Sequence, residues 1–174
     1  MKRNQEPLEK DVFAMFSPSW FSTYERTYLW IAGFKPGIPF KLVNKYIADL
    51  SEEQLQRMNT FRAEMGTRER KLTNELAQVQ ESVASSYLVG LGRRQVEERE
   101  ERRQADEAVS EMKEMMVTLV QSADLLRMTI VRGIVEILRP VQCVKFLATA
   151  AQLHLRIRMI GLEKDASRNR GSRT

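Results

Sequence analysis

The chain has 174 residues, a length typical of a single domain. Charged residues make up 29% of it and hydrophobic residues 43%, a composition that is able to bury a core. The net charge of +5 is small and Lys and Arg are interspersed with Asp and Glu, so charge alone gives little reason to expect a nucleic-acid-binding protein. The single cysteine, Cys143, excludes an internal disulfide and a cysteine-rich metal site, and it suits a reducing compartment.

The N-terminal segment, residues 1–11, is polar and contains no apolar run of signal-peptide length. Nowhere does the chain approach the roughly 18 consecutive apolar residues that a membrane span needs. We therefore expect a soluble, intracellular protein whose folded part begins near residue 12.

Two short helices are predicted after this segment. Ser22 is a suitable N-cap for a helix over 23–32, which Gly33 would end. Pro39 is tolerated in the first turn of the next helix, which we expect to stop near Asp49.

The next predicted helix is long. Ser51 and Gln54 have the spacing of a capping box, and apolar residues then recur on one helical face as far as about Ser86. Residues 93–107 are almost all charged, with both signs mixed. Such a segment is usually a solvated helix extension or a mobile loop, and a specific interaction tail is the alternative.

A second long helix shows the clearest periodicity in the chain. Its apolar residues are separated by three or four positions and form one continuous seam. The seam consists of Val109, Met112, Met116, Leu119, Ala123, Leu126, Ile130, Ile134 and Ile137. Few complementary charges flank it, so an intrachain bundle is a better interpretation than a coiled coil between chains.

Pro140 begins the last predicted helix, because proline is tolerated in a first turn but not in an interior. This helix is apolar on two sides. One side carries Val144, Leu147, Ala148, Ala151, Leu155, Met159 and Leu162, and the other carries Phe146, Ala150, Leu153, Ile157 and Ile160. A helix of this kind is expected to pack between neighbours. The predicted fold class is therefore all-α, a helical bundle with two long helices and a largely buried C-terminal helix, followed by a disordered basic tail over 163–174.

Three stretches, residues 17–36, 50–62 and 122–157, resemble the delay-of-germination (DOG) domain of plants. This domain occurs in stand-alone seed-dormancy regulators and as the C-terminal part of TGA-type bZIP transcription factors. In the first stretch Ala32 replaces the first glycine of a Gly-Gly-Phe-Arg-like pattern. The positions that match family motifs are Trp20, Glu25, Trp30, Gly33, Phe34, Asp124, Arg127 and Gln142, and we interpret them as structural. For the Asp124–Arg127 pair a partner contact is the alternative. The aromatic residues Trp20, Trp30, Phe34 and Phe40 are most simply core residues, and the wall of an acyl-chain pocket is the alternative.

The resemblance covers most of residues 12–162, which we take as a DOG-like helical domain. The family domain begins with one or two further helices, and residues 1–11 do not supply them. No basic region or leucine zipper precedes the domain either, so we do not expect direct, sequence-specific DNA binding.

His154 is the only histidine, and the resemblance implies that it is a candidate haem ligand. A core histidine is the simpler interpretation. His154 and Cys143 lie about 16 Å apart along a helix, too far to share one metal ion, so no metal site is predicted.

No nucleophile elbow, phosphate-binding loop or dinucleotide-binding turn is present in the sequence, so we do not expect an enzyme. The resemblance implies a non-catalytic regulatory module in the nucleus or the cytoplasm, acting in plant transcriptional or developmental regulation such as seed dormancy. Its expected partners are regulatory proteins, with homo- or heterodimers left open. The alternatives are a sensor of a small ligand, haem or a fatty acid, and a DNA-associated factor related to the TGA proteins.

Overall fold

The computed structural model describes residues 12–92 and 98–171. Its order of elements is α2 (Val12–Phe16), α3 (Thr23–Arg26), β1 (Leu29–Trp30), β2 (Gly33–Phe34), α4 (Ile38–Tyr46), α5 (Glu52–Gly92), α6 (Glu98–Ile137) and α7 (Pro140–Gly171). The predicted all-α class is confirmed, because the two-residue strands β1 and β2 are the only strands among the described residues. None of the described helices has the length and apolar character that crossing a membrane requires.

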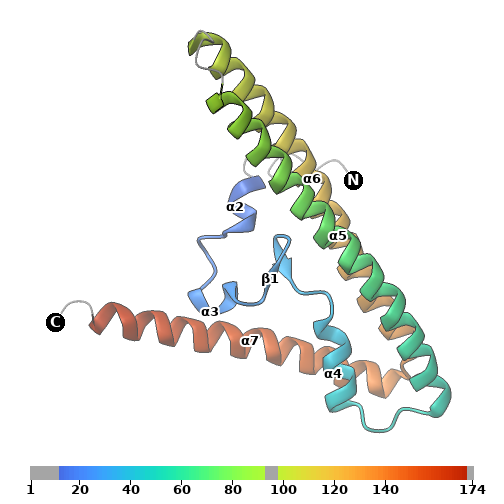
Figure 1. Cartoon of the computed structure of the whole chain (residues 1–174). Coiled ribbons are helices and arrows are strands. Elements are labelled where there is room, and N and C mark those ends of the chain that lie inside the picture. Colours follow the sequence, from blue (N-terminus) through green and yellow to red (C-terminus); the bar gives the residue numbers. More distant parts are fainter. Residues whose placement is uncertain (1–11, 93–97, 172–174) are drawn as a thin grey trace, which may run out of the picture.

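The two long helices, α5 and α6, lie side by side, and α7 leaves their base at an angle (Figure 1). The shorter elements fill the space between α7 and the long pair. The predicted start of α5 is confirmed: Gln54 N–H donates to Ser51 Oγ at 3.2 Å and Ser51 N–H donates to Gln54 Oε1 at 3.1 Å. The α5 helix continues beyond the predicted end near Ser86, as far as Gly92.

The seam on α6 lies in the core from Met116 to Ile137, whereas Val109 is exposed. One buried cluster joins α4, α5, α6 and α7 near the bend after Ile137. A second joins α2, the hairpin, α5 and α6 around Ala123 and Ile31. Burial of one seam against several elements is what the intrachain interpretation predicted.

The helix predicted over 23–32 is wrong beyond its first turn. The α3 helix ends at Arg26, and β1 pairs antiparallel with β2, Trp30 opposite Gly33. Ile31 and Ala32 make the turn with φ values of 42° and 59°. Such values are unfavourable for residues with a Cβ, most of all for a β-branched one, but the Ile31 side chain is buried in the second cluster. Burial therefore holds a turn that the local sequence does not favour.

Two expectations for the C-terminal region also need correction. The α7 helix is not largely buried: only one of its two apolar sides packs against the rest of the chain. Residues 163–171, expected in a disordered tail, continue α7, and Asp165 accepts a hydrogen bond from Thr23 N–H at 3.0 Å. Of the charged segment 93–107, residues 98–107 belong to α6 and 93–97 lie outside the described residues, as do the polar residues 1–11.

Candidate interaction surface

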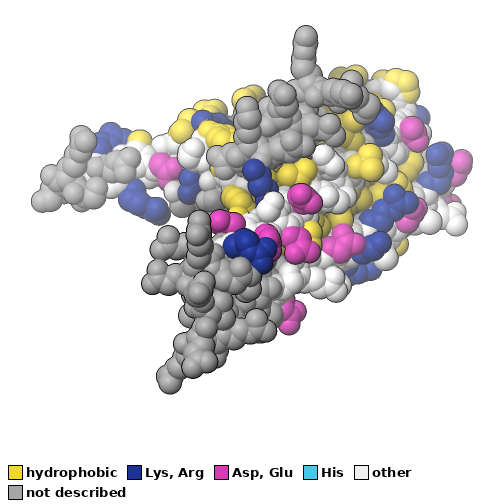
Figure 2. All heavy atoms as spheres, turned by 90° about the horizontal axis from the view of Figure 1, so that it is seen from above, with side chains coloured by type: hydrophobic (Ala, Val, Ile, Leu, Met, Phe, Trp, Pro, Cys, Tyr) yellow, Lys and Arg dark blue, Asp and Glu magenta, His cyan; other side chains and the backbone are white. Residues whose placement is uncertain are grey.

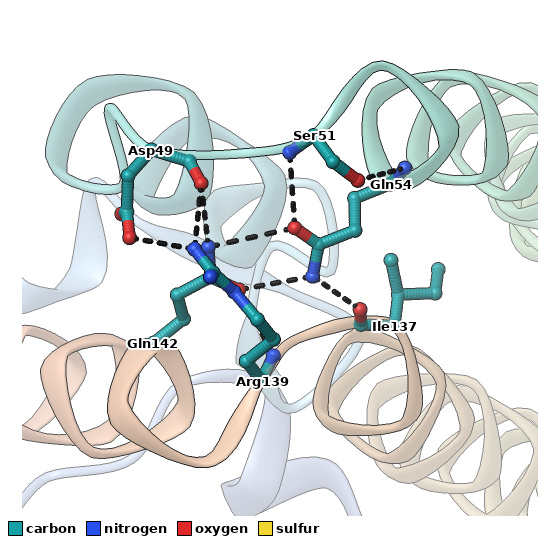
Figure 3. Close-up of polar contacts among 6 residues, drawn as sticks. All are labelled: Asp49, Ser51, Gln54, Ile137, Arg139 and Gln142. Atoms are coloured by element: carbon teal, nitrogen blue, oxygen red, sulfur yellow. Dashed lines mark hydrogen bonds and ion pairs between the residues drawn. The ribbon is translucent and has the colours of Figure 1, made fainter.

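A buried polar network fixes the bend between α6 and α7. Gln54 Nε2 donates to the Ile137 carbonyl at 2.7 Å and to Gln142 Oε1 at 2.9 Å, and Gln142 Nε2 donates to the Asp49 carbonyl at 2.9 Å (Figure 3). Gln142 Oε1 also accepts from Arg139 N–H at 2.9 Å. We call Asp49, Gln54, Arg139 and Gln142 the elbow network.

The elbow network ties three segments together: the loop before α5, the end of α6 and the start of α7. Gln142 is only 1% exposed, so its amide depends on these protein partners rather than on water. All buried side-chain nitrogen and oxygen atoms of the described residues have a hydrogen-bond partner. A fully satisfied network of this kind holds α7 in one direction relative to α5 and α6.

The second half of α7 is held by α3. Ser22 and Glu25 form a capping box, and the buried Glu25 carboxylate accepts a hydrogen bond from Arg158 Nη1 at 2.8 Å. A Cβ on Gly161 would lie 1.9 Å from Ser22 Oγ, so this close approach requires glycine. Burial alone raises the pKa of Glu25, but hydrogen bonds from Ser22 and Arg158 and the charge of Arg158 outweigh it and hold the pKa below its ordinary value.

Arg127 contacts four other motif positions: Trp30, Gly33 and Phe34 in the hairpin, and Asp124 on α6. Its guanidinium donates to the Phe34 carbonyl at 2.9 Å, to Asp124 Oδ1 at 2.6 Å, and to the carbonyls of Trp30 and Ile31. It also lies 5.5 Å from the centre of the Trp30 ring. A Cβ at position 33 would meet Arg127 Cζ at 2.6 Å, which explains the glycine there. Arg127 thus supports the strained turn from below.

Trp20 and His154 lie at the surface rather than in the core. Trp20, expected in the core, is 58% exposed. His154, for which a core position was the simpler interpretation, is exposed, and its ring centre lies 4.7 Å from that of Phe34. The described residues contain no group of three or more side chains suited to hold a metal ion. Haem ligation by His154 stays a prediction. An acyl-chain pocket also stays a prediction, because the pockets found among the described residues are open to the surface, with volumes of about 450–520 Å³.

The side of α7 that points away from the body is apolar and uncovered. Val144 and Met159 are each 68% exposed and Leu155 is 64% exposed, whereas Phe146 and Ile157 on the opposite side are buried. We define the outer face of α7 as Val141, Val144, Leu147, Ala148, Ala151, Leu155, Met159 and Leu162. Figure 2 views the molecule from above, from the side opposite to this face, and shows mainly charged side chains on the α7 arm at the left, with hydrophobic side chains nearer its base.

The extent of this face sets it apart from ordinary surface leucines. Its six large aliphatic side chains, each at least half exposed, present roughly 600 Å², which equals or exceeds the largest apolar patch of a typical monomer. Patches of this size mark interaction sites in soluble proteins. The two apolar sides of the helix are predicted from the sequence, but a helical wheel cannot tell which of the two sides the rest of the chain covers.

Comparison with known proteins identifies relatives of the chain. A family model described as "DOG1: Seed dormancy control" matches residues 1–45. Protein ZW2 of Arabidopsis thaliana is 37% identical over 156 residues, which are 87% of this chain and 69% of ZW2. Protein RESPONSE TO ABA AND SALT 1 of the same plant is 38% identical over 153 residues, 85% of this chain and 66% of that protein.

A shorter match connects the chain with transcription factors. Transcription factor TGA2.1 of Oryza sativa subsp. japonica is 32% identical over 82 residues, 47% of this chain and 25% of that protein. The chain spans about two thirds of the length of the two Arabidopsis proteins and a quarter of TGA2.1. From the extent of the match to ZW2, together with the family model, the chain belongs to the DOG family of plant proteins.

Proposed function

We propose that the chain is a non-catalytic regulatory module that acts through protein partners in plant transcriptional or developmental regulation. The observation that carries this proposal is the uncovered outer face of α7. A regulatory role of the family agrees with the names of its members, one of which refers to a response to ABA and salt. That response is a property of the relative, and the process in which this chain acts is part of the proposal.

The polar residues support an interaction role more than a chemical one. Glu25, Arg127 and Gln142 are each surrounded by hydrogen-bond partners from other segments of the chain, which position the helices. The Arg127 guanidinium is bonded to Asp124 and to the hairpin, which supports a structural role for this pair over a contact with a partner. The large side chains on the outer face of α7, by contrast, are each at least half exposed, which suits a surface that another protein covers.

The partial match to TGA2.1 supports an action near transcription, in the nucleus or the cytoplasm. In this proposal the chain contacts DNA only indirectly or nonspecifically. The C-terminal end carries Lys164, Arg168, Arg170 and Arg173, which are able to neutralise a few phosphates. Replacing the three arginines by glutamine keeps Asp165, which contacts Thr23, and should abolish salt-sensitive duplex binding. Retained preference for one duplex sequence over a scrambled one would contradict this part of the proposal.

The main experiment compares two leucine variants in plant cells. Leu155→Glu places a charge on the outer face of α7, and Leu55→Glu places the same charge on an exposed leucine of α5. Neither position is buried, so both variants should fold. We expect Leu155→Glu to lose the proteins found by proximity labelling and the transcript response to expression, and Leu55→Glu to keep both. Equal partner sets and equal transcript responses for the two variants would refute the proposed function.

A further inference from the structure

The outer face of α7 has the spacing of a helix-pairing seam. Along Val141, Val144, Ala148, Ala151, Leu155, Met159 and Leu162 the separations are 3, 4, 3, 4, 4 and 3 residues. At about 100° per residue these positions stay within one stripe for roughly 33 Å of helix. Alternating separations of three and four are those of side chains that interlock between two helices.

The stripe is accessible along its whole length. Its centre lies about 180–200° around the helix from Phe146 and Ile157, which face the body of the protein. The elements that pack most extensively against α7, namely α3 and α4, therefore lie on the other side of the helix. Small side chains at Ala148 and Ala151 allow a second helix to approach closely near the middle of the stripe.

We propose that the outer face of α7 pairs with the same face of a second copy of this chain, with the two helices antiparallel. This pairing rests on the proposed function, since it names the partner that covers the same surface. The charges that flank the stripe and the apolar area of the stripe favour a second copy as the occupant.

The charges beside the stripe are complementary when the helices run in opposite directions. Lys145 and Glu163 are exposed and lie on the same flank, at about the same angle around the helix. A two-fold axis beside position 154 has Lys145 nine residues on one side and Glu163 nine residues on the other. It therefore places Lys145 against Glu163 of the second copy twice, and Arg156 against the uncharged Gln152 of the second copy. In a parallel pair this flank faces the opposite flank of the second copy, so Lys145 and Glu163 do not meet.

The same axis interlocks the apolar residues. Ala148 falls between Met159 and Leu162 of the second copy, and Ala151 falls between Leu155 and Met159 of the second copy. Each copy would bury roughly 600 Å², so the pair buries about 1,200 Å² in total. This area lies at the lower end for specific interfaces and indicates a dimer that dissociates on dilution.

The first measurement is sedimentation of the full chain over concentrations of roughly 1–200 µM. We expect the unmodified chain to shift from monomer to dimer within this range. In Leu155→Glu the dissociation constant should rise more than about 100-fold, because a carboxylate from each copy enters the apolar contact. In Leu55→Glu it should change by less than about twofold. Thermal unfolding of both variants checks that each is folded.

The second measurement tests the direction of the helices. Lys145→Glu should weaken the dimer roughly tenfold, because it opposes glutamate to glutamate in two places. Adding Glu163→Lys in the same chain should restore the dissociation constant to within about threefold, because the two pairs are then reversed. Failure of the double variant to recover, in a chain that dimerises, would overturn the antiparallel arrangement.

The outcomes separate this inference from the proposed function. A chain that stays monomeric at every concentration, or a dimer that Leu155→Glu leaves unchanged, overturns the pairing. If that variant nevertheless loses its partners in plant cells, the surface binds a different protein and the proposed function survives. If the dimer behaves as expected but the partner sets and transcript responses do not change, the pairing stands and the proposed function fails.

Discussion

Gln142 at the elbow network offers a quantitative test of how α7 is held. In Gln142→Met the side chain keeps a similar length but becomes apolar, so the space remains filled while every hydrogen bond of the amide is removed. Arg139 N–H then loses the acceptor at 2.9 Å, and the Asp49 carbonyl loses one of its two donors. Gln54 keeps its bonds to Ile137 and Ser51.

The expected cost follows from this inventory. One donor, Arg139 N–H, is left without its partner at a part-buried position, which costs about 1–3 kcal/mol. The Asp49 carbonyl and the Gln54 amide are weakened but not orphaned, and each adds a fraction of a net hydrogen bond, about 0.5 kcal/mol. We therefore expect a loss of about 2–4 kcal/mol in the free energy of unfolding.

Urea denaturation followed by circular dichroism measures this loss. The matched control is Gln56→Met, the same substitution at an exposed position two residues after Gln54, and it should change the free energy of unfolding by less than about 0.5 kcal/mol. A Gln142→Met variant as stable as the Gln56→Met variant would refute the structural role that the geometry gives to the amide. Such a result would mean that packing alone holds the bend.

Three further predictions test the description of the fold. The pKa of Glu25 lies below its ordinary value of 4.5, so the ionised carboxylate stabilises the fold fully above about pH 4.5. This stabilisation is lost as the pH falls through the lowered pKa. The difference in urea midpoint between the unmodified chain and Glu25→Gln should therefore disappear in acid and persist in base. Ile157→Asp should lower the free energy of unfolding by more than about 3 kcal/mol, because Ile157 is buried, and Leu155→Asp should lower it by less than about 1 kcal/mol. Equal melting temperatures for the two variants would show that the Ile157 side of α7 is not the buried one. Ala32→Gly should raise stability by about 0.5–1 kcal/mol, because glycine adopts a φ of 59° without strain, and a loss in thermal unfolding would contradict this.

The helix starts and the core seam could be predicted because their causes are local. Ser51 and Gln54 satisfy each other's backbone groups across three residues, and Pro140 excludes a continuous helix from α6. The spacing of the apolar residues on α6 is enough to predict which side is buried, because a helix with a single apolar side turns that side toward the core.

The hairpin and the exposure of α7 could not be predicted because their causes lie far away in the sequence. The turn at Ile31 and Ala32 is held by Arg127, more than ninety residues later, and by burial of Ile31. The Gly-Gly-Phe-Arg-like pattern, with alanine in place of the first glycine, was the one signal of a left-handed turn there. On α7 the two apolar sides look alike on a wheel, and only the contacts with α3 and the elbow network decide which of them is buried.

Peroxide oxidation of the methionines tests most directly whether the outer face of α7 is open in the isolated chain and covered in its assembly. Met159 on that face and Met128 on α6 are both more than half exposed, whereas Met58 and Met65 are buried. In the dilute purified chain, peptide mapping by mass spectrometry should show Met159 and Met128 oxidised at similar, high rates and Met58 and Met65 protected. In the assembly isolated from plant cells, Met159 should become protected while Met128 stays reactive. Protection of Met159 in the dilute chain, or equal reactivity of Met159 and Met128 in the assembly, would contradict the account.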